Sequence, residues 1–243
     1  MDARSQLVCL WSGYAFFPLY VIGFIFIAGF VPPPSPSLGA GEIAALFDHN
    51  RWNILVGMSI SDVASVLFVA WCVAIFAQLS RIEAGARVFS YVQLISGSIG
   101  AAFFMISPMV WLVMAFRSGH NPDTLLILND FAWVSWIISW PFFFGQLVAV
   151  SLCIFFSRTD QKIIPRWVAY FSFWSGLSMF PAILVVFFKA GPFAWNGLLA
   201  LYLPLALYAI WYHVMLIVLL KALREKTQQE TTHVELLPSL NSQ

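Results

Sequence analysis

A carboxylate stands inside an apolar run of the sequence: Asp62 in "GMSISDVASVLFVAWCVAIF", residues 57–76. A charged side chain at the centre of a membrane-spanning helix costs about 2.5–3.5 kcal/mol on insertion scales, and such residues usually mark proton, ion or ligand sites. Ser59 and Ser65 lie three residues to either side, on the same face of a helix as Asp62. We therefore expect this polar face to look into the protein, with Asp62, Ser59 and Ser65 at a ligand-binding site.

Asp130 is the second acidic candidate, near the outer end of a later apolar segment. Two carboxylates beside one cavity can act as general acid and general base when their environments differ, so Asp62 and Asp130 are the candidate catalytic pair of an enzyme. Structural alternatives stay open for both. Asp62 can bind a neighbouring helix or pair with Lys189 or Arg117, and Asp130 can be an N-terminal helix residue that the helix dipole favours.

Aromatic residues and prolines gather at the same level as these carboxylates. We predict an outward-facing, aromatic-walled pocket with Asp62 at its rim, because prolines in membrane helices are tolerated where neighbours or a cavity satisfy the freed backbone groups. The alternative is an ordinary belt of interfacial aromatic residues with ordinary helix kinks. The tryptophans predicted to bind the ligand are Trp111, Trp133, Trp140 and Trp195, and the bending prolines are Pro108, Pro141 and Pro204.

The remaining reactive side chains form no motif of a metal, cofactor or nucleophile site. The sequence has four histidines, and no two are spaced at i and i+4, as a zinc protease requires. It contains no G-x-S-x-G, P-loop or G-x-G-x-x-G pattern. The three cysteines lie in apolar runs and are expected to be packing residues. We predict no metal site and no cofactor, and the lack of a basic patch argues against nucleic-acid binding.

The composition indicates which solvent surrounds these residues. Apolar residues make up 61% of the chain and charged residues only 9%, far below the quarter that is typical of soluble domains. Six apolar segments are long enough to cross a hydrocarbon core of about 30 Å as helices, and no strand pattern competes with them. The sequence predicts an all-α bundle of six transmembrane helices, at approximately 7–31, 53–79, 88–116, 125–156, 167–188 and 196–220.

Basic residues predict how this bundle is oriented. One set of segment ends carries nine lysines and arginines and the opposite set three, which under the positive-inside rule makes both termini cytoplasmic. We expect a transmembrane domain over residues 1–224 and a disordered cytoplasmic tail over residues 225–243, which are polar and poor in aromatics. The inner set is Arg4, Arg81, Arg87, Arg158, Lys162, Arg166, Lys221, Arg224 and Lys226, and the outer set is Arg51, Arg117 and Lys189.

The first outer loop, "PPPSPSLGAGEIAALFDHNR", begins with prolines that cannot continue a helix. It continues with Ile43, Leu46 and Phe47 at i, i+3 and i+4, the apolar side of a short helix. We predict that this short helix lies in the membrane interface, where it either covers the mouth of the bundle or rests on the bilayer.

Two stretches, "GFVPPPSPSLGAGEIAALF" and "VVFFKAGPFAWNGLLA", carry a family resemblance. The sequence resembles an uncharacterised family of multi-pass membrane proteins of similar length from mycobacteria and related bacteria, over most of the chain. The resemblance implies a bacterial plasma (inner) membrane. It carries no activity, cofactor or catalytic residue with it.

Four functions are compatible with these features. The first is binding of a lipophilic small molecule, such as a lipid, sterol or isoprenoid. The second is a cofactorless isomerase or cyclase that uses Asp62 and Asp130. The third is a proton-coupled transporter, for which Gln93, Gln146 and His213 offer a thin polar trail toward the cytoplasm. The fourth is a homo-oligomer or a subunit of a larger complex, in which the small residues of 96–102 pack closely within or between chains.

Overall fold

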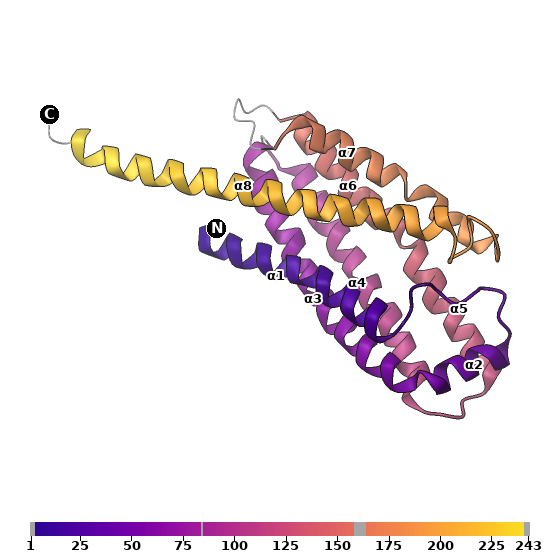
Figure 1. The fold of residues 1–243 in the computed structure, drawn as a ribbon. Helices are drawn as coiled ribbons and strands as arrows, with labels where there is room; N and C mark the ends of the chain where they lie inside the picture. The colour runs from indigo at the N-terminus through magenta and orange to yellow at the C-terminus, as the bar shows by residue number, and fades with distance from the viewer. Residues whose placement is uncertain (1–2, 84, 158–163, 241–243) are drawn as a thin grey trace.

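The computed structural model describes residues 3–83, 85–157 and 164–240, and these form helices without any strand (Figure 1). Six helical segments are long and apolar enough to cross a membrane, which confirms the predicted six-span bundle. Their bounds are Ala3–Ile27, Arg51–Ile82, Val88–Phe116, Pro122–Phe155, Arg166–Val186 and Leu198–Glu225.

Several spans combine more than one helical element. The α-helices are α1 (Ala3–Val21), α2 (Ala40–His49), α3 (Arg51–Ile82), α4 (Val88–Phe116), α5 (Pro122–Ile138), α6 (Trp140–Phe155), α7 (Arg166–Leu177) and α8 (Leu203–Leu240). Two π-helical segments, η1 (Ile22–Ile27) and η3 (Leu198–Tyr202), continue α1 and precede α8, and a 3₁₀ segment, η2 (Phe180–Val186), follows α7.

The over-long fourth apolar segment is two helices in line. Asn121 caps the start of α5, because its side-chain oxygen accepts from the Asp123 amide at 2.8 Å, and Pro122 occupies the first turn, where no amide is needed. The chain breaks at Ser139 between α5 and α6. Pro141 lies in the first turn of α6, so its missing amide and its ring favour this break.

α3 and α4 form the centre of the bundle. α3 packs against α1 on one side and α4 on the other, and α4 also packs against α5 and α6. α7 packs against α6, while α8 returns alongside α1 and α7 (Figure 1). The start of α1 and the end of α8 lie at one end of the bundle and α2 lies at the other.

The short helix predicted in the first loop is present as α2. It buries Ile43 and Phe47, which are 1% and 2% exposed, and it packs against the start of α5. The amide of Gly39 donates to the Glu42 carboxylate at 2.8 Å, which satisfies one of the free amides at the helix N-terminus. α2 therefore covers the end of the bundle opposite the termini.

The last helix extends beyond the predicted transmembrane domain. α8 continues as one helix to Leu240, so residues 225–240 are helical, and residues 241–243 lie outside the described chain. Lys221 and Glu225 form an i, i+4 ion pair at 4.0 Å, and the good helix formers around them favour continuation. Two cations used for the orientation, Arg158 and Lys162, also lie outside the described residues.

The small residues of α4 bring helices together within the chain. A Cβ atom at Gly97 would lie 2.5 Å from the Cys72 sulfur of α3 and from the Gln146 amide nitrogen of α6. At Gly100 it would lie 2.8 Å from the Phe143 ring of α6. The stretch 96–102 therefore serves close packing of α4 on α3 and α6.

Candidate functional site

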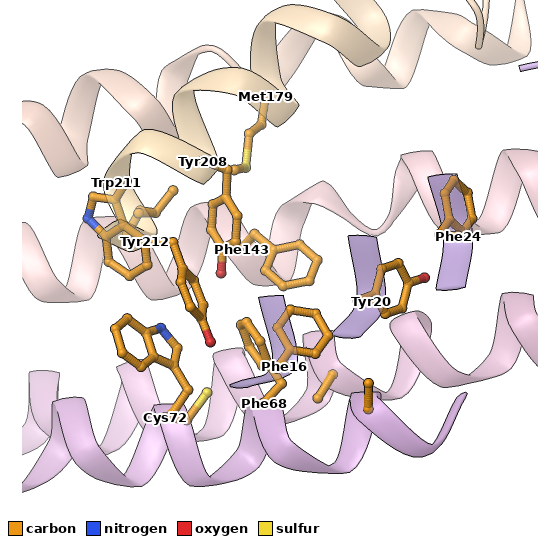
Figure 2. Packing of buried hydrophobic residues seen from close by; sticks show 14 of the residues in the cluster. Phe16, Tyr20, Phe24, Phe68, Cys72, Phe143, Met179, Tyr208, Trp211 and Tyr212 are labelled. Atoms are coloured by element: carbon orange, nitrogen blue, oxygen red, sulfur yellow. The ribbon is translucent and has the colours of Figure 1, made fainter. Parts of the chain in front are cut away.

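Two rows of aromatic residues face one another across the first and last spans. In α1 and η1, Phe16, Tyr20 and Phe24 follow at four-residue intervals, so their rings share one side of the helix. In α8, Tyr208 and Tyr212 have the same spacing. Figure 2 shows Phe16, Tyr20 and Phe24 in a row, with the two tyrosines of α8 beside them.

A cavity of about 400 Å³ lies between these two rows. Residues 16–25 form one wall and residues 202–212 the other, with Val31 near the loop and Phe104 and Trp136 behind. No charged side chain lines this cavity, whose walls all belong to the described part of the chain. Its size and apolar lining are typical of small-molecule pockets, which span about 300–1,000 Å³.

The cavity has a buried floor and an exposed rim. Tyr20 and Tyr212, on the floor, are 7% and 0% exposed, whereas Leu205 and Ala206 on the rim are exposed. These rim residues belong to a membrane span, so the medium in front of them is hydrocarbon. The cavity therefore opens sideways, between α1 and α8, toward lipid.

The hydroxyl groups of the α8 tyrosines are engaged away from the cavity. Tyr212 donates to the Gly13 carbonyl at 2.7 Å, and Tyr208 donates to the Gln146 side-chain oxygen at 3.1 Å. The amide nitrogen of Gln146 in turn lies 3.5 Å from the Cys72 sulfur. These polar groups satisfy one another, so Tyr208 and Tyr212 offer the cavity mainly their rings.

A group of polar contacts lies in the cavity wall around the Tyr20 hydroxyl, and it includes the Phe104 carbonyl and the Trp136 indole. We call this group the polar focus. Pro108 has no amide to donate to Phe104 one turn earlier, so the Phe104 carbonyl is free for other donors. Ser65 reaches this carbonyl at 2.9 Å and Tyr20 at 3.4 Å. The Trp136 indole donates to the Tyr20 oxygen at 3.1 Å. Tyr20, Phe104 and Trp136 all line the cavity, and the proline in α4 explains why these groups meet.

Asp62 does not line the cavity. It is half-buried on α3, one turn before Ser65, and its charge acts on Tyr20. Its Oδ1 atom is buried and has no hydrogen-bond partner among the described residues. Ser65 faces inward as expected, but Ser59 is exposed, so the expected inward face does not extend to Ser59.

Asp130 has a different environment. It is half-buried on α5, and the charge that acts on it is that of Lys189. Within residues 3–83, 85–157 and 164–240 we find no hydrogen bond and no electrostatic coupling between Asp130 and Asp62. The structure therefore shows no direct contact between the two members of the predicted acid–base pair among the described residues.

Three of the predicted tryptophans form a packed cluster instead of a pocket wall. The ring centroids of Trp111 and Trp133 are 5.0 Å apart, and those of Trp133 and Trp195 are 6.4 Å apart. Phe30 fills the remaining space, 4.9 Å from Trp111. Trp195 also donates to the Pro34 carbonyl at 2.7 Å, which ties two loops together. This cluster stabilises the end of the bundle.

Trp140, the fourth, lines a second and smaller cavity of about 80 Å³. This cavity shares Phe104, Trp136 and Tyr208 with the larger one. The ring of Trp140 packs against Phe180, with centroids 4.6 Å apart. The two cavities therefore share part of their walls, and Trp140 belongs to the smaller one.

The other polar residues predicted along the spans are separated from one another. Gln146 binds Tyr208, as described above. Gln93 is fully buried, with no partner for its amide among the described residues. His213 lies at the seam of α1 and α8, where its Nδ1 atom is 2.7 Å from the Ala209 carbonyl and its ring packs on Phe17. These groups form no continuous polar path in the described chain.

Tyr20, Tyr208 and Tyr212 were not predicted as site residues. The four-residue spacing of aromatics in the first and last apolar segments was the available signal. Aromatic spacing of this kind also occurs in ordinary packing, so only the pairing of the two segments reveals a cavity.

The described residues contain no group of three or more histidine, cysteine or acidic side chains placed to hold a metal ion. Comparisons of the chain with protein-family models, with curated proteins and with solved structures each return no match, so the site must be interpreted from its own geometry.

Proposed function

We propose that this integral membrane protein binds a lipophilic small molecule, of lipid, sterol or isoprenoid type, in the cavity between α1 and α8. The observation that carries the proposal is the apolar cavity of about 400 Å³ with an exposed rim between two membrane spans. A molecule dissolved in the bilayer reaches such a rim by lateral diffusion, without crossing water. Aromatic walls then replace its contacts with lipid tails.

Binding is better supported than catalysis. An enzyme of the kind considered needs two acid–base groups within reach of one substrate, whereas neither Asp62 nor Asp130 lines the cavity. A transporter needs a polar path to the cytoplasmic side, and the buried Gln93 and the seam residue His213 do not connect to one another. A carrier or chaperone for a lipophile requires only the cavity.

Filling the cavity should abolish binding. Ala209→Phe introduces a ring into the lining, so we expect the retained ligand to fall at least tenfold relative to wild type. Mass spectrometry of small molecules that co-purify with the protein in mild detergent measures this. Ile210→Phe is the matched control, because Ile210 is 54% exposed and does not line the cavity. Equal ligand content in wild type and both folded variants, or bulk phospholipid alone in all three, contradicts the proposal.

The location proposed with this function is the bacterial plasma membrane, with both termini in the cytoplasm. The nine-to-three distribution of basic residues supports this orientation, and an even number of spans requires both ends on one side. Reporter fusions at either terminus should therefore be active only with a cytoplasmic reporter such as green fluorescent protein. Periplasmic alkaline phosphatase activity from either fusion contradicts the orientation.

A further inference from the structure

The walls of the large cavity restrict the head group that a ligand can bring into it. No lysine, arginine or histidine lines the cavity. A carboxylate or phosphate buried there would have no cation to offset its lost hydration, which is costly in an apolar environment. Asp62 lies one turn before Ser65 on α3, and its carboxylate, when ionised, adds repulsion toward an anion at Tyr20.

Three tyrosine hydroxyls have described hydrogen-bond partners, and the lengths of these hydrogen bonds differ. Tyr212 and Tyr208 donate at 2.7 and 3.1 Å. Tyr20 donates at 3.4 Å, well beyond the usual 2.7–2.8 Å for two oxygens, so this bond is weak. Among these three hydroxyls, that of Tyr20 is therefore the one whose proton is most readily donated to a ligand.

Ser65 allows Tyr20 to shift its hydrogen bond from the Phe104 carbonyl to a ligand without leaving that buried carbonyl unsatisfied. Its oxygen lies 2.9 Å from the Phe104 carbonyl and 2.8 Å from the Ser61 carbonyl, and its single proton can go to either. When Tyr20 turns its proton to a ligand, Ser65 still serves Phe104. Trp136 continues to donate to the Tyr20 oxygen, which makes the Tyr20 hydroxyl a better donor.

We propose that the ligand is a neutral lipophile with one oxygen function, a hydroxyl or carbonyl, whose oxygen accepts a hydrogen bond from Tyr20. Fatty acids and phosphorylated lipids are disfavoured, because the cavity offers an anion no cation and places Asp62 nearby. This inference rests on the proposed function and adds the class of ligand to it.

Three probes that differ only at one end test the inference on the full chain in detergent micelles. They are the isoprenoid alcohol geranylgeraniol, the same chain without the hydroxyl, and geranylgeranoic acid. We expect wild type to bind the alcohol about tenfold more tightly than the hydrocarbon, which corresponds to about 1.4 kcal/mol, and the acid more weakly than the alcohol.

Three variants test which residues cause the preference for the alcohol. Tyr20→Phe should remove the preference for the alcohol, while Tyr91→Phe, which loses the hydroxyl of an exposed tyrosine outside the cavity, should retain it. Asp62→Asn should raise the affinity for the acid relative to the alcohol. An alcohol preference that is unchanged in folded Tyr20→Phe overturns the inference. Equal binding of alcohol and hydrocarbon by wild type overturns it too but leaves the proposed function standing, whereas binding of none of the probes contradicts both.

Discussion

We expect Gly13→Ala to lower the free energy of unfolding by about 2–3 kcal/mol, although alanine is the better helix former by about 1 kcal/mol. A Cβ atom at Gly13 would lie 2.6 Å from both the Cα and the N atom of Trp71 on α3. Backbone atoms in the middle of a helix cannot move aside singly, so α1 and α3 must separate. Trp71 also stacks on Tyr212, with centroids 4.1 Å apart, and Tyr212 donates to the Gly13 carbonyl. The strain therefore reaches α8.

Thermal unfolding in detergent measures this effect. For a chain of this size the loss corresponds to a Tm lower by roughly 5–10 °C. Gly41→Ala is the matched control, because Gly41 lies within α2 and a Cβ atom there meets nothing within 4 Å. We expect its Tm to stay the same or rise slightly. A Tm for Gly13→Ala as high as that of the control would show that α1 and α3 are not in contact at Gly13.

The same junction explains the shape of the candidate site. The Tyr212 hydroxyl joins α8 to α1 at Gly13. Beyond Gly13, over residues 16–25 and 202–212, the cavity separates the aromatic rows of the two segments. Tyr208 is held toward α6 by Gln146, so it does not close the gap. The shape of the cavity thus depends on the hydrogen bonds of the two tyrosine hydroxyls. Loss of the Tyr212 bond would remove the contact that holds α8 against α1 at Gly13.

Composition and segment length were sufficient to predict the membrane spans. Apolar runs and their polar ends depend on the chain alone, and the short helix α2 was predicted from Ile43, Leu46 and Phe47 at helical spacing. The helical continuation to Leu240 was missed, because a polar composition argued for disorder while the local helix formers favoured a helix.

The candidate site was less accessible to prediction, because it depends on contacts between distant segments. The hydrogen bond from Trp136 to Tyr20 joins residues 116 positions apart. The predicted tryptophan pocket illustrates the same limit: Trp111 and Trp133 were predicted at one level of the bundle, but no local pattern reveals that Phe30 packs against both of them. Likewise, Asp62 and Asp130 lie on different helices whose separation has no signature in the sequence.

We expect Glu83→Ala to destabilise the protein by about 3 kcal/mol, because one carboxylate holds the start of α4. Glu83 lies in the short connection after α3 and accepts from the amides of Phe89 and Ser90, both at 2.8 Å, and from the Ser90 hydroxyl at 2.6 Å. Its removal leaves donors of the first helical turn unsatisfied next to the buried Cys153 of α6. Hydrogen bonds to a charged group contribute about 1.5–3 kcal/mol each, and water that enters the site recovers part of this.

Two further variants separate capping from the loss of a charge. Glu83→Gln keeps one acceptor oxygen in place, so its Tm should fall between those of wild type and Glu83→Ala. Glu42→Ala removes the comparable cap of α2, but that contact is exposed and consists of a single bond to the Gly39 amide, so about 1 kcal/mol or less should be lost. Equal losses for Glu83→Ala and Glu42→Ala would mean that water replaces the Glu83 carboxylate freely, and that α4 starts at Val88 because of packing against α3 and α6 and not because of its cap.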